Sequence, residues 1–458
     1  MLLDLLALAA EADAAAPAIV SASGEVTYGE WLARATALAA GMQDEALTSV
    51  ACAIGDVPTL LAVLAGAAGA GVEACTYPAS APVELVDELA TAFGHDTLIT
   101  DRADLGGRSD RRALTPGDLE RPGSPRVPAP AATPLLVLTT GTTGRPKAAR
   151  HDWRRLVGAV RADAVPAGSR WLLAYNLNQF AGIQVVLHAL VGRATLVVPP
   201  GNQPRESLAF ARKAGVTHLS ATPTFWRFGL GLLGDGEGPD LEQITLGGEA
   251  PSDALLADLR RHFPRARISQ IYASTEGGSV VSVTDGRSGL PLSVLERGED
   301  ADAQVRIVDG ELQVRSRVGM LGYLDAAAGD DTAATEEGDG WRATGDLVEV
   351  VGDRITFVGR SSEVINVGGV KVHPLPIEAA ALGVAGVVAA HAHGRANPVA
   401  GQIVQLDLVL APDADEEAVE DAVRDACGDL PPAAQPRLIR FVDELEVREQ
   451  KIARSTAD

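Results

Sequence analysis

The alternation of short apolar runs with amphipathic segments constrains the fold of this chain more than any other feature. Segments 180–193 and 252–263 have helical periodicity, and Ser252 stands where an N-cap is expected. They lie among apolar runs of strand length, which are 134–140, 169–175, 194–199, 217–222, 243–247 and 267–272. Strands and helices that alternate at this interval predict a doubly wound α/β sheet, in which ligands bind at the C-terminal ends of the strands.

The pattern changes near residue 303. Residues 304–316 alternate with period two around Asp309-Gly310, which predicts a β-hairpin, and 353–359 reads as another strand. We therefore expect a large N-terminal domain, residues 1–359, of doubly wound α/β layers with a β subdomain. A small α+β domain, residues 360–458, should follow it. The Pro- and Gly-rich stretch 104–133 is interpreted as a surface connection.

Composition excludes several classes of function. The chain has 458 residues, with 39 Lys and Arg against 61 Asp and Glu, so its net charge of −22 disfavours binding to nucleic acid. The N-terminus has no basic stretch typical of a signal peptide, and the uncharged run 57–72 is shorter than the ~20 residues of a membrane span. The three cysteines lie far apart, which is typical of a reducing compartment. We expect a soluble, cytoplasmic protein, a monomer or homodimer.

A loop rich in glycine and threonine follows the run 134–140 directly. Its glycines allow the backbone to approach phosphate oxygens, and its hydroxyls and ammonium supply hydrogen-bond donors. Lysine occurs only at positions 147, 213, 371 and 451, while arginine supplies the rest of the 39 basic residues. The residues that we expect to bind phosphate are Thr139, Thr140, Gly141, Thr142, Thr143, Gly144 and Lys147.

This loop, LVLTTGTTGRPK, resembles the signature loop of the adenylate-forming superfamily of acyl-CoA synthetases, aryl-acid ligases and peptide-synthetase adenylation domains. Other segments resemble the family in the same order, so that the resemblance spans residues 28–454. They are Gly247–Pro251, Tyr272–Glu276, Thr344–Asp346, the hinge-like segment from Gly359, and the closing segment with Lys451.

The resemblance implies ATP-dependent activation of a small organic or aromatic carboxylic acid as an acyl-adenylate, then transfer to a thiol. Coenzyme A is the expected acceptor, and Mg²⁺ the expected metal. The implied nucleotide-binding residues after the loop are Gly248, Glu249, Ala250, Tyr272, Asp346 and Arg360. Glu276 is the implied Mg²⁺ ligand, and Thr275, Glu276 and Lys451 are the implied catalytic residues. These groups suit the chemistry, because two anions must approach each other while pyrophosphate leaves.

The resemblance also implies that the C-terminal domain is a mobile lid hinged near Ser362. Gly368, Gly369 and Lys371 would then approach the thiol substrate, although a plain glycine turn explains the same residues. The acid pocket is assigned to Gln179, Phe180 and Ala273. Gln179 falls where amino-acid-activating relatives keep an Asp, so a free α-amino acid would bring an unpaired charge into the pocket.

Two alternatives stay open at this point. One keeps the adenylation but transfers the acyl group to a carrier protein or to an amine. A carrier protein is usually acidic and would need a local basic surface on a chain of charge −22, which favours coenzyme A. The other is a non-catalytic homologue that binds nucleotide or an acyl ligand. A terminal lysine is often a solvated side chain, so the position of Lys451 alone does not decide between them.

Overall fold

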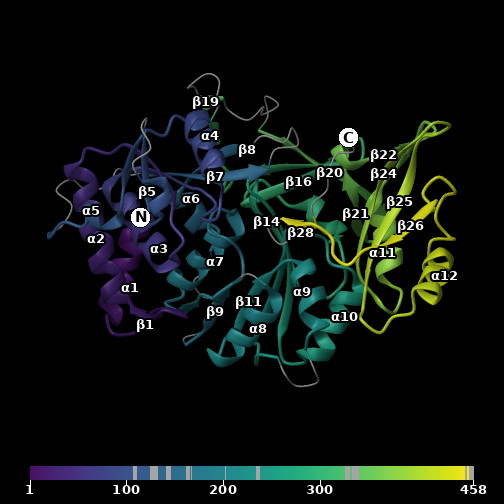
Figure 1. Cartoon of the computed structure of the whole chain (residues 1–458), viewed down its shortest axis with the longest axis horizontal. Coiled ribbons are helices and arrows are strands. Elements are labelled where there is room, and N and C mark those ends of the chain that lie inside the picture. Colours follow the sequence, from purple (N-terminus) through teal and green to yellow (C-terminus); the bar gives the residue numbers. More distant parts are fainter. Residues whose placement is uncertain are drawn as a thin grey trace. The chain divides into compact units, whose positions relative to one another are not determined.

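The computed structural model describes residues 1–106, 111–123, 133–140, 146–160, 166, 168–201, 203–233, 238–324, 331–332, 340–448 and 451–452. The chain forms two compact units, each made of segments that are distant in the sequence. Unit 1 comprises Met1–Ser220, Ala273–Val280 and Ser316–Gly340, and unit 2 comprises Ala221–Tyr272, Val281–Arg315 and Trp341–Asp458. Figure 1 labels the elements and colours the chain from purple at the N-terminus to yellow at the C-terminus.

Unit 1 contains two sheets. The first has the strand order β19-β18-β8-β7-β4-β3-β5-β6, in which β7, β4, β3, β5 and β6 are parallel. Its strands are β3 Ser49–Ala53, β4 Glu73–Thr76, β5 Thr97–Thr100, β6 Arg112–Leu114, β7 Pro134–Thr140, β8 Pro146–Asp152, β18 Gly322–Leu324 and β19 Asp331–Thr332. The second sheet contains β2 Gly24–Thr27, β1 Pro17–Ser21, β10 Thr195–Val197, β9 Arg170–Leu173 and β11 His218–Ala221, in that order.

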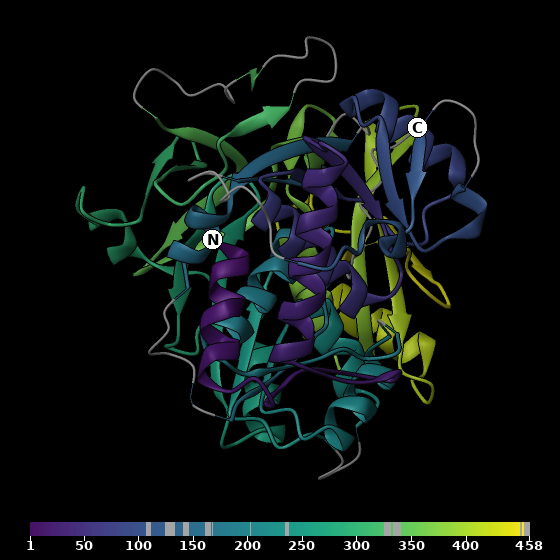
Figure 2. The same cartoon turned by 90° about the vertical axis from the view of Figure 1, so that its left-hand side faces the viewer.

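Helices cover both faces of the first sheet, as the alternation in β3 shows. Val50 and Cys52 belong to one apolar core, with residues of α1, α2, α3 and α7, whereas Ala51 and Ala53 belong to another core with α4. Figure 2 shows α1 and α2 running side by side. The helices of unit 1 are α1 Leu2–Ala12, α2 Tyr28–Asp44, α3 Val57–Ala70, α4 Val83–Phe93, α5 Pro116–Leu119, α6 Trp153–Gly158, α7 Phe180–Val191, α8 Pro204–Lys213 and the 3₁₀-helix η1 Ala103–Leu105.

Unit 2 combines a β subdomain with the C-terminal part of the chain. The strand order is β15-β21-β20-β17-β16 in the subdomain, and β23-β22-β25-β24 with β26 beside β25 in the C-terminal sheet. The strands are β12 Gln243–Gly247, β15 Leu290–Pro291, β16 Ala303–Val308, β17 Glu311–Ser316, β20 Arg342–Val351, β21 Arg354–Arg360, β22 Ile365–Val367, β23 Val370–Val372, β24 Val387–Asn397, β25 Gly401–Leu410, β26 Leu438–Phe441, β27 Val447–Arg448 and β28 Lys451–Ile452. The helices are α9 Pro223–Leu230, α10 Asp253–His262, α11 Pro374–Leu382, α12 Glu416–Ala426, and the 3₁₀-helices η3 Leu292–Glu296 and η4 Ser361–Glu363.

Four of the described strands contribute residues to both units; they are β11, β13 Arg267–Ser274, β14 Gly278–Val283 and β17. Within unit 2, β13 runs parallel to β12. The crossing point in β13 falls between Tyr272 and Ala273. Neighbouring positions of one predicted motif therefore belong to different units.

Most elements that the sequence predicts are present. The six predicted strand runs correspond to β7, β9, β10, β11, β12 and β13. The hairpin of β16 and β17 turns at Asp309 and Gly310, whose φ angles of 50° and 78° are those that the predicted turn requires. The side chain of Ser252 accepts the backbone N–H of Leu255 and caps α10 as predicted.

The interpretation of 104–133 as a connection is wrong for residues 112–119. These residues form β6, which extends the sheet beside β5, and α5, which buries Leu119 completely. Thr115 and Asp118 form a capping box that starts α5. Residues 107–110 and 124–132 lie outside the described residues.

The predicted domain boundary, Gly359-Arg360, falls at the end of β21. The two compact units do not divide the chain there, so this boundary stays a prediction. The uncharged run 57–72 forms α3, a buried helix packed against α2. None of the helices in the described part of the chain has the length and apolarity that crossing a bilayer requires.

Candidate active site

The predicted phosphate loop joins β7 to β8, which form an antiparallel hairpin in unit 1. Thr139 is paired with Lys147 and Thr140 with Pro146 across this hairpin. The loop residues Gly141, Thr142, Thr143 and Gly144 lie outside the described residues. The strands that flank the loop thus place Thr139 directly opposite Lys147.

Lys147 lies against an aromatic ring from a distant segment of the chain. Its ammonium is 5.2 Å from the centre of the Tyr323 ring, within the range of a cation–π interaction. The strand register explains the contact, because Tyr323 of β18 is paired with Ala149 of β8. Lys147 is two residues from Ala149 and therefore on the same face of the sheet.

Glu276, the predicted metal ligand, is half-buried in unit 1 just after β13. The Tyr323 hydroxyl donates a hydrogen bond to Oε1 of Glu276. The backbone of Glu276 is also held, since its carbonyl accepts the N–H of Met320 at 2.9 Å. Thr275, the other predicted catalytic residue here, is half-buried beside it in the sequence.

The residues assigned to the acid pocket lie at the start of α7 and the end of β13. The side-chain carbonyl of Gln179 accepts the backbone N–H of Asn176 at 3.1 Å, which closes the turn before the helix. Phe180 is buried with its ring centre 5.5 Å from that of His151, and Ala273 packs against the same apolar core as Phe180. Gln179 thus contributes a neutral amide.

In unit 2, the predicted ribose-binding carboxylate has two partners. The hydroxyl of Tyr272 donates to Oδ2 of Asp346 at 2.7 Å, and Nε of Arg360 donates to Oδ1 at 3.1 Å. Asp346 and Arg360 are register partners in the β20–β21 ladder, so the backbone pairing places them together. The structure therefore unites three residues that the sequence predicts to bind ATP.

Tyr272 is fixed by more than its hydroxyl. Its ring centre lies 5.2 Å from that of Phe357 on β21. Burial raises the pKa of the Tyr272 phenol well above its ordinary value, and the charge of Asp346 raises it further. The phenol is therefore neutral at physiological pH and serves as a hydrogen-bond donor to Asp346.

The turn predicted to line adenine follows β12. Gly248 is exposed and has a φ of 85°, a conformation that favours glycine, and Ala250 is also exposed. The carboxylate of Glu249 accepts the backbone N–H of Thr224 at 2.9 Å and the Thr224 hydroxyl at 2.7 Å. Glu249 thus fastens the turn to the N-terminus of α9.

The predicted thiol segment is an exposed turn between β22 and β23. Gly368 and Gly369 have φ angles of 59° and 88°, and a Cβ atom at either position would meet nothing within 4 Å. The Asn366 side chain accepts the N–H of Gly369 at 3.0 Å, and Lys371 is exposed on β23. Ser362, the predicted hinge, is exposed in η4. These positions are open, and their roles stay predictions.

Lys451 lies in β28, which pairs with β27 in a short hairpin of unit 2. Its register partner is Arg448, and its side chain lies outside the description. β28 lies close to α9, the helix to which Glu249 is bound. Within unit 2, β28 therefore lies beside α9, the helix to which the predicted adenine turn is bonded through Glu249 (Figure 1).

The predicted residues thus form two described groups. In unit 1, Lys147 and Glu276 are joined through Tyr323, which the sequence analysis missed. In unit 2, Tyr272, Asp346 and Arg360 are joined directly. Tyr323 is 47 positions from Glu276 in the sequence, and only the pairing of β18 with β8 brings it there.

The donor chemistry in unit 1 fits Mg²⁺. Among the described residues, no three His, Cys, Asp or Glu side chains gather as a complete set of metal ligands. Mg²⁺ is usually held by one or two carboxylates, with substrate phosphates and water as the other ligands. A half-buried carboxylate that Tyr323 links to Lys147 matches that pattern, with Glu276 as the residue that would hold the ion.

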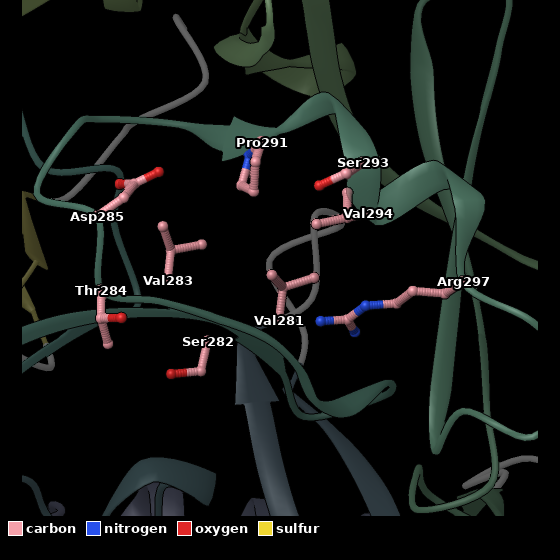
Figure 3. Close-up of a pocket in the computed structure, with 9 residues that line it drawn as sticks. All are labelled: Val281, Ser282, Val283, Thr284, Asp285, Pro291, Ser293, Val294 and Arg297. Atoms are coloured by element: carbon pink, nitrogen blue, oxygen red, sulfur yellow. The ribbon is translucent and has the colours of Figure 1, made fainter.

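A surface cavity of about 290 Å³ in unit 2 is separate from these groups. Its lining includes Ser282, Thr284, Ser293 and Arg297, and their side chains surround an open hollow (Figure 3). None of the predicted site residues lines it.

Comparison with known proteins places these groups in a family. The family model "AMP-binding enzyme" matches residues 6–324, and "AMP-binding enzyme C-terminal domain" matches residues 376–450. The chain belongs to the AMP-binding enzyme family. The resemblance inferred from the sequence motifs is therefore confirmed.

Individual relatives share under a third of their aligned residues with this chain. The chain is 29% identical over 296 residues to a 2-succinylbenzoate–CoA ligase of Bacillus velezensis, an alignment that covers 61% of this chain and 59% of that ligase. The chain thus matches about three fifths of the length of that relative.

Two solved structures show the same fold over nearly the whole chain. The anthranilate CoA ligase AuaEII in complex with anthranoyl-AMP has a TM-score of 0.85 at 18% identity, covering 98% of this chain and 95% of that one. The o-succinylbenzoate CoA synthetase of Bacillus subtilis with ATP and magnesium has a TM-score of 0.75 at 20% identity, covering 96% of each chain. The predicted fold class, a large α/β N-terminal domain followed by a small C-terminal domain, is confirmed.

Proposed function

We propose that this protein is an AMP-forming acid–thiol ligase that activates a small organic or aromatic carboxylic acid with ATP and transfers the acyl group to coenzyme A. The observation that carries the proposal is the family match over residues 6–324 in a chain that retains the charged groups of the reaction. Those groups are Lys147, Glu276, Asp346, Arg360 and Lys451.

The first step joins two anions. A carboxylate oxygen of the acid attacks the α-phosphorus of ATP, the bond from this phosphorus to the bridging oxygen breaks, and pyrophosphate leaves. Lys147 offsets phosphate charge, and Asp346, held by Tyr272 and Arg360, orients the ribose through its remaining acceptor lone pairs. Mg²⁺ held by Glu276 would supply further positive charge at the phosphates.

The second step needs no further nucleotide chemistry. The thiol sulfur attacks the acyl carbon, the bond to the AMP oxygen breaks, and the thiol loses its proton. The exposed turn at Gly368 and Gly369 has open space around it, which suits the approach of a long thiol arm. We assign the lid motion about Ser362 and the thiol role of Lys371 as parts of this proposal.

The pocket favours an acid without a charged amine. Gln179 provides an amide whose carbonyl is already bonded to Asn176, and Phe180 and Ala273 contribute apolar surface. An α-ammonium group would lose its hydration there without gaining a countercharge from Gln179. Proteinogenic amino acids should therefore be poor substrates.

The substrates of the proposed reaction indicate that the protein acts in the cytoplasm. ATP and coenzyme A are intracellular substrates, and the cysteines Cys52, Cys75 and Cys427 are all buried free thiols. We expect the protein to act there as a monomer or homodimer.

The experiment is pyrophosphate release over a panel of aliphatic, aromatic and amino acids, with mass spectrometry of the products with and without coenzyme A. We expect an acyl-adenylate without coenzyme A and an acyl-CoA with it, for acids that lack an α-amine. The Glu276→Gln variant should lose the release, whereas Glu242→Gln, an exposed acid of unit 2, should keep it.

Each other result contradicts part of the proposal. Adenylate formation without transfer to coenzyme A would assign the acceptor to a carrier protein or an amine. ATP binding without pyrophosphate release for any acid would identify a non-catalytic homologue. Efficient turnover of an ordinary amino acid would contradict the role given to Gln179.

A further inference from the structure

Tyr323 lies between the two charged groups on which the phosphate chemistry of unit 1 depends. Its ring faces the Lys147 ammonium at 5.2 Å, and its hydroxyl donates to the Glu276 carboxylate. A cation and an anion that the reaction needs are thus both held by one side chain. We propose that Tyr323 is a positioning residue that sets the Glu276 carboxylate for Mg²⁺ and the Lys147 ammonium for the ATP phosphates.

The pairing of β18 with β8 places Tyr323 near Lys147. β18 pairs with β8, so that Tyr323 faces Ala149 and lies diagonally across from Lys147. Backbone pairing therefore fixes Tyr323 to β8, the strand that follows the predicted phosphate loop. Side chains that are diagonal across two strands are within reach of each other when one of them is aromatic.

The segment before β18 holds the other partner. The N–H of Met320 donates to the carbonyl of Glu276, and a Cβ atom on Gly319 would lie 2.6 Å from that same oxygen. A Cβ atom on Gly278 would likewise lie 2.8 Å from the carbonyl oxygen of Val318. Glycines at these positions let residues 318–320 pack directly against the loop that carries Glu276.

Glu276 is therefore held at two points from one segment, its backbone by Met320 and its carboxylate by Tyr323. A carboxylate fixed in one orientation binds a cation with a smaller loss of side-chain entropy. A carboxylate can accept several hydrogen bonds, so the bond from the phenol does not prevent Glu276 from binding a metal ion.

The inference rests on the proposed function, because it concerns Mg²⁺ and ATP at that site. The experiment measures binding and not turnover. Calorimetry gives the dissociation constant of a non-hydrolysable ATP analogue with Mg²⁺ and with EDTA. The ratio of the two constants reports how strongly the metal and the nucleotide are coupled.

Tyr323→Phe removes the hydroxyl and keeps the ring. We expect it to lower the coupling ratio by about tenfold, as for a hydrogen bond to a charged group, while leaving metal-free binding nearly unchanged. Tyr323→Leu also removes the ring, so we expect it to weaken metal-free binding by a further factor of about two to five.

Tyr28→Phe is the matched control. The Tyr28 hydroxyl donates to the carbonyl of Ala194 at 2.7 Å in the core of unit 1, so this variant loses an equivalent buried hydrogen bond away from the site. It should keep the coupling ratio. Thermal melting of every variant checks that the chain is folded.

A double-mutant cycle makes the test specific. In a Glu276→Gln background, where the charged partner is absent, Tyr323→Phe should change the coupling ratio little further. Additive effects of the two substitutions, an unchanged ratio in Tyr323→Phe, or an equal loss in Tyr28→Phe would each overturn the inference. A wild-type protein whose analogue binding is not strengthened by Mg²⁺ would instead refute the metal–ATP site of the proposed function, and the inference with it.

Discussion

At the scale of single residues, the proposed ribose contact in unit 2 depends on Asp346. Both of its carboxylate oxygens have protein partners, Tyr272 and Arg360, and its backbone N–H donates to the Thr344 hydroxyl at 3.1 Å. Such a carboxylate is oriented before any ligand arrives. Pre-orientation reduces the entropy that ATP binding must overcome.

Asp346→Ala should therefore raise the ATP concentration needed for half-maximal pyrophosphate release by about 10- to 100-fold, because charge-assisted hydrogen bonds are lost. Asp353→Ala is the control, since the Asp353 side chain forms an exposed ion pair with Arg287 at 2.8 Å. Initial rates against ATP concentration measure both variants. An unchanged ATP dependence in Asp346→Ala would show that the ribose assignment is wrong.

A buried histidine predicts how stability depends on pH. Burial lowers the pKa of His95 to about 4, and the Tyr77 hydroxyl lies 2.7 Å from its Nδ1 atom. The unfolded state, with an ordinary histidine pKa of about 6.5, binds the proton first as pH falls. The contribution of neutral His95 to the free energy of unfolding is therefore fully present above about pH 6.5. This contribution is lost as the pH falls from about 6.5 to about 4.

At pH 5 this residue should cost about 2 kcal/mol of unfolding free energy relative to pH 7. Urea denaturation at the two pH values measures the loss. His95→Gln should show a correspondingly smaller loss, whereas His262→Gln, at the end of α10, should behave like the parent. If the parent and His95→Gln lose the same free energy, His95 is not the group that titrates.

The elements themselves were largely predictable from the sequence. Strand runs, the Asp309-Gly310 turn and the Ser252 cap are local signals, and the structure contains them. The contacts of the site were not predictable. Glu249 bonds to Thr224 and Tyr323 to Glu276 across 25 and 47 positions, and such pairings depend on strand order and register.

The start of α7 shows how an element positions residues of the predicted acid pocket. Gly182, in the first turn of the helix, faces the carbonyl oxygen of Asn176, which a Cβ atom would approach to 2.2 Å. Asn176 also donates its N–H to the Gln179 side chain. The missing side chain of Gly182 therefore lets the turn fold onto the helix.

Gly182→Ala should destabilise the protein by about 1–3 kcal/mol through overpacking, in spite of the higher helix propensity of alanine. It should also raise the acid concentration needed for activity, since Gln179 and Phe180 move with the turn. Gly158→Ala in α6, where a Cβ atom meets nothing within 4 Å, is the control and should be neutral or slightly stabilising. Denaturant midpoints distinguish the two variants, and equal midpoints would refute the packing argument.

At the scale of the whole molecule, the chain distributes the predicted site residues over both compact units. β13 carries Tyr272 in one unit and Ala273 in the other. The sequence predicted the motifs and their order, because each is a short local pattern. The sequence did not predict how the motifs are divided between the two units. That division depends on long-range packing, which short local patterns do not reveal.

The proposed function comprises two successive reactions that use different groups of one protein, and a Lys451 variant is expected to distinguish them. A mobile ammonium can contact the carboxylate and the α-phosphate mainly in the transition state. Such a contact lowers the activation free energy by roughly 3–4 kcal/mol, which raises the rate on the order of a hundred- to a thousandfold. The second reaction lacks the charge that this ammonium offsets. Lys213, an exposed lysine at the end of α8, provides the matched control.

The most direct measurement compares both half-reactions in Lys451→Ala, with the acid identified by the panel. We expect adenylation to fall on the order of a hundred- to a thousandfold, while synthetic acyl-adenylate and coenzyme A give product at nearly the parent rate. Lys213→Ala should match the parent in both. Adenylation within a few-fold of the parent, or an equal loss with preformed acyl-adenylate, would contradict the two-step account.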